Sequence, residues 1–143
     1  MKKLALIALL SSMVITITYP VVEVVSAYGY RNQVDGKELK AGYILQNGKK
    51  VAAVERTNTD GSLDNSFGTN GLVTTKIATQ SYATRIHPQA DGKIFVEGWA
   101  SFAEDPLNAE DRFVFKARYN PNGTLDTTYA KNGIFLEREE VKL

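Results

Sequence analysis

The stretch RTNTDGSLDNSFGTNGLVTT, residues 56–75, returns in a weaker form as RYNPNGTLDTTYAKNGIFLE at residues 118–137. A second pair precedes it, with DGKELKAGY at residues 35–43 and DGKIFVEGW at residues 91–99. The two pairs are offset by 62 and 56 positions, so the second copy contains a loop six residues longer, within SFAEDPLNAEDR at residues 101–112. A repeat of this length is typical of propeller blades and related arrays. We therefore expect each copy of the 56–75 stretch to be the crossover between two blades.

The segments between the turns alternate apolar and polar residues, as half-buried strands do. In RFVFKARY, residues 112–119, the apolar side chains of Phe113, Phe115, Ala117 and Tyr119 share one face. One full blade of four antiparallel strands is predicted at 71–120, with strands at 71–77, 82–87, 93–102 and 112–120. A partial blade at 28–57 precedes it (strands 28–33, 38–46 and 50–57), and a terminal strand at 133–141 follows. The predicted fold class is all-β, with about two antiparallel four-stranded propeller-type blades in an incomplete ring.

The first 27 residues, MKKLALIALLSSMVITITYPVVEVVSA, have the features of a secretory signal peptide. Lys2 and Lys3 form a basic head, an apolar run follows, and small residues end the segment at Ala27. The alternative is an uncleaved membrane anchor, but Pro20 and Glu23 interrupt the run before the roughly 20 apolar residues that a spanning helix needs. We expect a signal helix at 1–27, cleavage after Ala27, a β-repeat domain at 28–143, and a secreted or cell-envelope location. Membrane association is expected only if the signal stays uncleaved.

The composition excludes several classes of function. The chain has no cysteine, so disulfides, thiolate nucleophiles and cysteine–zinc sites are excluded. Removal of residues 1–27 leaves equal numbers of basic and acidic side chains. Nucleic-acid binding needs clustered excess positive charge, so no nucleic-acid partner is expected. No phosphate loop, dinucleotide fingerprint or GxSxG elbow is present, and no cofactor is expected.

The motifs resemble the delta-60 repeat family, a set of bacterial propeller-type blades found mostly in long exported proteins. The family pattern, roughly DGKIVVAGY…ARYNxDGSLDxSFGxxGxVTT, is similar to DGKIFVEGW, ARYNPNGTLDTTYAKNGIF and ERTNTDGSLDNSFGTNGLVTT in this chain. The likeness covers most of residues 33–135. It implies a propeller-type fold and no common catalytic residue. Family members usually carry many repeats, whereas this chain has about two.

Recurrence within the 56–75 stretch also predicts local contacts. Arg56 and Arg118 stand eight residues before Asp64 and Asp126, and we expect each arginine to pair with its aspartate on the surface. Such an exposed pair would contribute only about 0–1 kcal/mol. Leu63 and Phe67 are expected to anchor the first loop on the sheet beneath it.

Metal chemistry is not favoured by the residues present. Counted as a calcium loop with Gly61 at the sixth position, the 56–67 segment has Arg56 at the first position and Phe67 at the twelfth, where oxygen ligands are required. A shallow calcium site built from carboxylates and carbonyls remains an alternative. His87 is the only histidine, and a single imidazole without cysteines does not make a zinc site.

Two groups of side chains are candidates for function. Acidic residues gather in the 101–112 loop, where paired carboxylates of a carbohydrate hydrolase are the alternative to a solvated loop tip: Glu104, Asp105, Glu110 and Asp111. Aromatic residues form a candidate ligand or packing surface: Trp99, Tyr82, Phe102 and Tyr119. For the aromatic group, packing between blades is the simpler interpretation.

The leading hypothesis is an exported, non-enzymatic binding or assembly module with an unknown protein or glycan ligand. Two blades do not close a ring, because propellers have about four to eight. We expect head-to-tail self-association, in which the terminal strand 133–141, from Gly133 to Val141, completes the 28–57 sheet of the next subunit. In a monomeric alternative the same strand pairs with residues 38–57 of its own chain in a two-sheet sandwich. A secreted carbohydrate hydrolase and a fragment of a longer repeat protein are two competing hypotheses.

Overall fold

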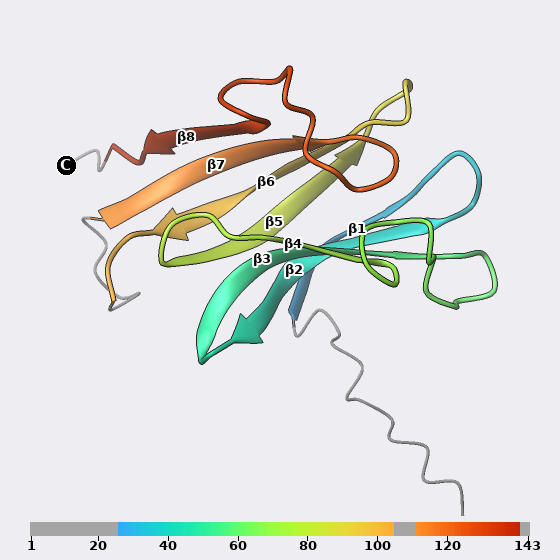
Figure 1. Cartoon of the computed structure of the whole chain (residues 1–143), viewed down its shortest axis with the longest axis horizontal. Helices are drawn as coiled ribbons and strands as arrows, with labels where there is room; N and C mark the ends of the chain where they lie inside the picture. Colours follow the sequence, from blue (N-terminus) through green and yellow to red (C-terminus); the bar gives the residue numbers. More distant parts are fainter. Residues whose placement is uncertain (1–25, 105–110, 141–143) are drawn as a thin grey trace, which may run out of the picture.

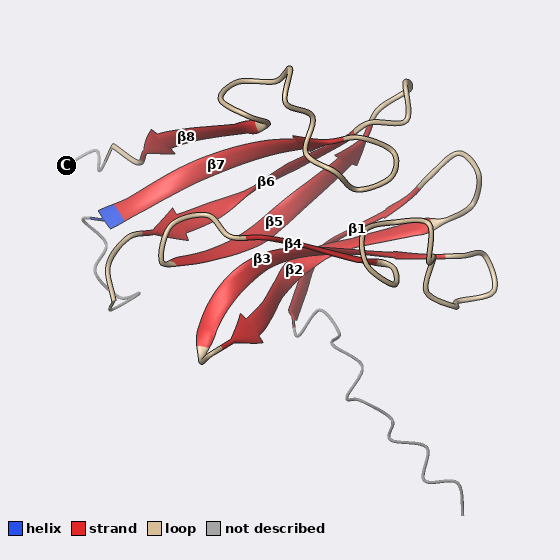
Figure 2. Ribbon diagram, viewed as in Figure 1, coloured by secondary structure: helices blue, strands red, loops and turns tan. Residues whose placement is uncertain are grey.

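The structure is a computed structural model that describes residues 26–104 and 111–140, and eight β-strands make up its two antiparallel four-stranded sheets (Figures 1 and 2). The N-terminal sheet has the order β1 (Ser26–Asn32), β2 (Glu38–Gln46), β3 (Lys49–Thr57), β4 (Leu72–Thr75). The C-terminal sheet has the order β5 (Gln80–Pro88), β6 (Ile94–Ser101), β7 (Arg112–Tyr119), β8 (Ile134–Arg138). The prediction of an all-β fold with antiparallel four-stranded sheets is confirmed.

The predicted signal helix lies almost entirely outside the described residues, which begin with β1 at Ser26. None of the described segments forms a helix long and apolar enough to cross a membrane. Cleavage after Ala27 would remove only the first two residues of β1, which pair with Tyr43 and Gly42 of β2.

The division of the strands between the sheets differs from the predicted one. β4 pairs with β3, with Val73 opposite Val54, and not with β5. β8 in the same way pairs with β7, with Leu136 opposite Phe115. The predicted full blade at 71–120 and partial blade at 28–57 are therefore wrong, because each sheet takes the strand that follows its own copy of the repeated stretch.

The hydrogen bonds of the repeated stretch explain this division. The Asp64 amide donates to the Arg56 carbonyl at 2.9 Å, and the Arg56 amide donates to the Gly71 carbonyl at 2.8 Å. These bonds return the chain to the edge of β3, whereas only residues 76–79 join β4 to β5. The stretch therefore closes a sheet and does not cross between sheets. The first three strands already have a fourth partner, so the slot expected for residues 133–141 of another subunit, or of the same chain, is filled by β4.

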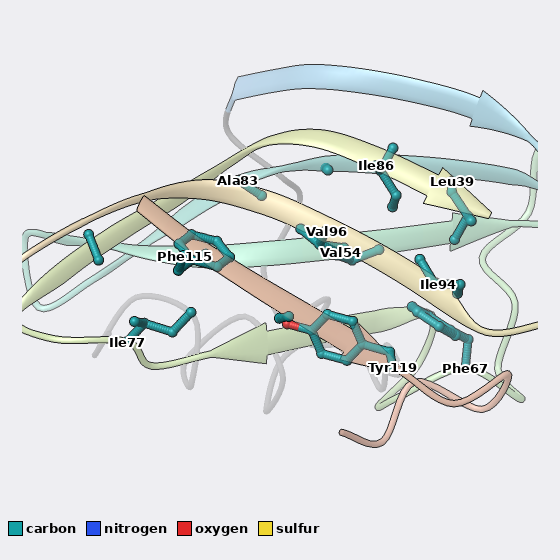
Figure 3. Packing of buried hydrophobic residues seen from close by; sticks show 14 residues of the cluster. Leu39, Val54, Phe67, Ile77, Ala83, Ile86, Ile94, Val96, Phe115 and Tyr119 are labelled. Atoms are coloured by element: carbon teal, nitrogen blue, oxygen red, sulfur yellow. The ribbon is translucent and has the colours of Figure 1, made fainter. Parts of the chain in front are cut away.

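One hydrophobic core joins the two sheets (Figure 3). Strand β5 lies against β1, β2 and β3, as Figure 1 also shows. Alternate residues of β7 point into this core, where Phe115 and Ala117 are fully buried, as the period of two predicts. The main contributors from both sheets are Leu39, Ala41, Val54, Ile86, Ile94, Val96, Phe115 and Tyr119. Phe67 is also fully buried there, which confirms its predicted role as the anchor of the first loop.

A cluster of charged side chains braces each repeated loop. Arg56 Nε donates to Asp64 Oδ2 at 2.7 Å, and Arg118 Nε donates to Asp126 Oδ2 at the same distance, so both predicted pairs are confirmed. Each aspartate also accepts a lysine ammonium, from Lys37 at 2.8 Å in the first loop and from the equivalent lysine, Lys93, in the second. The first pair is not at the surface as expected, because the side chains of Arg56 and Asp64 are only 8% and 6% exposed. The lysines had a signal in the sequence, since both follow Asp-Gly in the 35–43 and 91–99 segments.

Candidate ligand site on the outer face of the second sheet

Trp99 and Tyr82 lie together on the face of the C-terminal sheet that points away from the core. They are opposite each other in neighbouring strands β6 and β5. Trp99 has the opposite alternation to the buried residues Val96 and Ala100 of the same strand. The outer face of the C-terminal sheet, as we use the term, comprises Tyr82, Arg85, His87, Phe95, Glu97, Trp99, Val114, Lys116 and Arg118.

The other two candidate aromatic residues do not join this pair. Tyr119 is 3% exposed in the core, and its hydroxyl lies 2.6 Å from the hydroxyl of Thr75. Burial raises the pKa of Tyr119 to about 12, against the opposing effect of the Thr75 hydrogen bond. Phe102 is 52% exposed and packs edge-on against Phe113, with ring centroids 5.3 Å apart. Of the four predicted residues, two therefore share one surface, and Tyr119 serves packing.

An aromatic pocket of about 200 Å³ opens beside Trp99. Its walls come from both sheets, with Lys50 at the start of β3 and the remaining residues on or beside β5, β6 and β7. The lining that bears functional groups consists of Lys50, Gln80, Tyr82, Trp99, Ser101 and Arg112. The packing of the two sheets against each other brings Lys50 close to the other five residues.

Two cations of the pocket are stacked on aromatic rings. The Arg112 guanidinium carbon lies 4.4 Å from the centroid of the Trp99 ring. Lys50 Nζ lies 4.8 Å from the Tyr43 ring and 5.4 Å from the Tyr82 ring. Each such cation–π contact contributes on the order of 0.5–2 kcal/mol, depending on its exposure to water. The stacking therefore holds both positive charges at the pocket instead of leaving them to move in solvent.

The described residues that line the pocket carry a net positive charge. Among the described residues no carboxylate oxygen lies within 4.0 Å of Lys50 Nζ. Arg112 Nε lies 3.6 Å from Glu139 Oε2, but both side chains are more than one third exposed, so water screens this pair. Neither cation was predicted as a site residue from the sequence, although Lys50 and Arg112 are separated by the same 62 positions as the repeated stretches.

A second hollow of about 240 Å³ lies on the other side of Trp99, which lines both. Its other lining residues include Arg85, Glu97 and Val114. Glu97 has three positively charged or titratable neighbours, with N–O distances of 3.7 Å to Arg85, 3.9 Å to His87 and 3.8 Å to Lys116. The only histidine of the chain is thus an exposed neighbour of a carboxylate, on the same outer face.

The loop carboxylates are only partly described. Glu104 bonds Lys49, and Asp111 lies 3.9 Å from Arg138 and accepts a hydrogen bond from Ser101 at 3.4 Å. Neither lines the aromatic pocket, and Asp105 and Glu110 lie outside the described residues. Within residues 26–104 and 111–140, no three His, Cys, Asp or Glu side chains are grouped so that they could hold a metal ion.

Comparison with known proteins identifies the repeats. A family model described as "Domain of unknown function (DUF5122) beta-propeller" matches residues 33–67 and 89–129, which together make up more than half of the chain. No curated protein and no solved structure matches the chain. The two matched segments begin at the equivalent Gln33 and Gln89 and contain the Asp-Gly-Lys turns and the loops closed by Asp64 and Asp126. The chain therefore belongs to the DUF5122 beta-propeller family.

Proposed function

We propose that this protein is an exported, non-enzymatic binding module whose ligand occupies the aromatic pocket beside Trp99. The observation that carries the proposal is the composition of this pocket: two aromatic side chains and two stacked cations from different sheets converge on one concave surface. Pockets with flat apolar walls and a few placed polar groups are where small ligands usually bind.

Export rests on the sequence of residues 1–27, with its basic head, apolar run and small residues before position 28. The resemblance to delta-60 repeats, which occur mostly in exported proteins, supports the same location. N-terminal sequencing of the chain recovered from culture medium or periplasm tests this proposal. A mature N-terminus at Tyr28 is expected, and an intact Met1 in a cytoplasmic fraction would contradict it.

Binding is favoured over the hydrolase alternative by the partners of the loop carboxylates. A glycosidase needs two carboxyl groups at a fixed separation across the scissile bond. Glu104 and Asp111 instead pair with Lys49 and Arg138, and the described residues that line the aromatic pocket include no carboxylate.

The chain provides its own reporter for binding, because Trp99 is its only tryptophan. We expect the intrinsic fluorescence of the purified exported chain to change on titration with its ligand, in a panel of envelope glycans and peptides. Tyr30→Ala is a matched tyrosine control, since Tyr30 is 50% exposed but lines neither hollow. Tyr82→Ala should abolish the response and Tyr30→Ala should retain it. A panel without any response, or equal loss in both variants, would refute the proposed site.

We also propose that copies of the chain associate through the terminal strand. In this arrangement the outer edge of β8 pairs with another copy, and no strand fills a vacant position in the N-terminal sheet. Among the described strands, β8 has one neighbour in its sheet, as β1, β4 and β5 do, and it exposes Phe135 and Leu136 by 40% and 36%. Open apolar edges of this kind tend to pair with another strand. Light scattering should show a dimer or larger species that Phe135→Lys converts to monomer. A monomeric wild-type chain at micromolar concentration would exclude assembly.

A further inference from the structure

The aromatic pocket and the second hollow differ in charge, and this difference indicates how charge should be distributed along a ligand that occupies both. The aromatic pocket contains Lys50 and Arg112, whereas the second hollow contains the carboxylate of Glu97. A uniformly anionic polymer, such as a nucleic acid strand, would meet repulsion at Glu97. A ligand with one anionic group in the pocket and uncharged polar groups beyond Trp99 matches both.

The geometry of Arg112 favours a carboxylate as the anionic group. Its guanidinium is held 4.4 Å from the Trp99 ring centroid, which restricts the plane of its donors. A planar guanidinium binds a carboxylate through two parallel hydrogen bonds. Lys50, held over Tyr82, adds a second charge from the opposite sheet. Glu139, 3.6 Å from Arg112 and 36% exposed, is the carboxylate that a ligand would displace.

The size and walls of the pocket favour a sugar ring. A volume of about 200 Å³ is smaller than the roughly 300–1,000 Å³ of pockets for drug-sized ligands, so it suits a single ring. Tyr82 and Trp99 offer flat apolar surface with a polar edge. Gln80 in the same lining offers an amide that can bond sugar hydroxyls, whereas the Ser101 hydroxyl already donates to Asp111 and accepts from the Ala103 amide.

We propose, resting on the proposed binding function, that the aromatic pocket recognises a carboxylated sugar unit of an acidic glycan. The carboxylate binds Arg112 and Lys50, and the ring lies against Tyr82 and Trp99. The next unit of the glycan, which is uncharged, crosses Trp99 into the second hollow.

The test is fluorescence titration of the purified exported chain with three probes. These are galactose oligomers that carry one galacturonate unit (called galacturonate oligomers below), galactose oligomers of the same length without that unit, and a peptide rich in glutamate. The galacturonate oligomers should bind at least about tenfold more tightly than the galactose oligomers, because the galactose oligomers lack the charge-assisted hydrogen bonds. This preference should weaken as salt is raised.

Matched variants identify the charges responsible. Lys50→Gln and Arg112→Gln should each weaken galacturonate binding by about tenfold or more, and by a larger factor than they weaken galactose binding. Lys76→Gln removes the same charge from an exposed residue outside both hollows and should have no effect. Arg112→Lys should retain only part of the affinity, because an ammonium lacks the two-pronged geometry. Thermal melts of all variants confirm folding.

The outcomes separate this inference from the proposed function. Equal binding of galactose and galacturonate oligomers, or binding of the acidic peptide alone, would overturn the carboxylated sugar and leave a binding site at Trp99. Equal losses in Lys76→Gln and Lys50→Gln would overturn the role of the pocket charges. If none of the three probes binds but another member of the wider panel changes Trp99 fluorescence, only the further inference fails. If nothing changes it, both fail.

Discussion

Replacing Asp64 by alanine should destabilise the fold strongly, because this carboxylate sits at the centre of a buried cluster. It accepts hydrogen bonds from Lys37 Nζ at 2.8 Å, from Arg56 Nε at 2.7 Å, and from the amide and hydroxyl of Ser66. Alanine would leave the Arg56 guanidinium, with a side chain only 8% exposed, without its counter-ion.

Asp126→Ala is the matched control, since Asp126 makes the equivalent bonds in the second loop. Its arginine, Arg118, is 26% exposed, so water can replace the lost carboxylate. Arg56 also donates to the Pro121 carbonyl at 2.7 Å and thereby ties the first loop to the second. We therefore expect a smaller loss of stability at Asp126 than at Asp64.

The magnitude follows from the burial of the Asp64 cluster. Removing one partner of a buried ion pair costs about 3–5 kcal/mol. With a urea dependence of roughly 1–3 kcal/mol per M, the unfolding midpoint should fall by at least about 1 M. Urea unfolding followed by Trp99 fluorescence measures both variants. Equal shifts for the two variants, or a loss below about 1 kcal/mol for Asp64→Ala, would refute the argument from burial.

The stability difference at Asp64 should also depend on pH. Burial alone would raise the pKa of Asp64, but hydrogen bonds from Lys37, Ser66 and Arg56 outweigh it and hold the pKa well below its usual value of 3.8. A carboxyl group whose pKa is lower in the folded state stabilises the fold at pH values above its pKa in the unfolded state. This contribution to the free energy of unfolding is lost progressively as the pH falls below that pKa. The difference between wild type and Asp64→Ala should therefore be full at pH 7 and shrink below about pH 4. A difference that grows in acid would contradict the assignment.

Three further predictions concern the core. Gly98→Ala should abolish or severely weaken folding, because a Cβ there would lie 2.1 Å from the Tyr82 carbonyl oxygen, and circular dichroism of the purified variant reports the loss. Phe115→Ala should lower the free energy of unfolding by about 3–5 kcal/mol in urea titration, since Phe115 is fully buried. The pKa of Tyr119 is raised to about 12 from the usual 10.0. The neutral phenol therefore makes a contribution to the free energy of unfolding that is complete below pH 10 and is lost as the pH rises towards 12. Tyr119→Phe should remove that pH dependence and also leave the Thr75 hydroxyl without its partner, which unfolding titrations at pH 9 and pH 11 will show.

The strands and the loop contacts were predictable because they depend on neighbouring residues. The period of two in residues 112–119 places Phe115 and Ala117 in the core, where the structure has them. The pairing of Arg56 with Asp64 follows from its recurrence 62 positions later. Recurrence did not reveal burial, because the exposure of Arg56 depends on how the second repeat packs against the first.

The division into sheets was not predictable from the repeat. A sequence with a period of about 60 residues and four strands per period can be divided into four-stranded blades from any starting strand. The strand at 72–75 could therefore begin one blade or end another. The choice is made by hydrogen bonds within the loop, such as that from the Arg56 amide to the Gly71 carbonyl. The pocket escaped prediction for a related reason: Lys50 reaches Tyr82 only through the packing of one sheet on the other.

The charges on the outer faces of the two sheets bear on whether a further blade can stack on either of them. Between the sheets, the cross-strand pairs Ala41–Val54 and Val96–Ala117 belong to one core. On the opposite faces, the positions equivalent to these apolar pairs hold ions: Lys40 opposite Glu55 at 3.3 Å, and Glu97 opposite Lys116 at 3.8 Å.

Stacking a third sheet on either opposite face would take the partly exposed lysine of one of these ion pairs out of water, a cost that the attraction within the pair often does not repay. Charged outer surfaces are what terminal units of repeat proteins need. On the first sheet the ion pair borders an apolar cluster of Ile44, Val51 and Ala53, so the charge of Lys40 is what opposes stacking there. On the second sheet the pair of Glu97 and Lys116 disfavours a covering blade in the same way, which favours an outer face around Trp99 that is open to a small ligand.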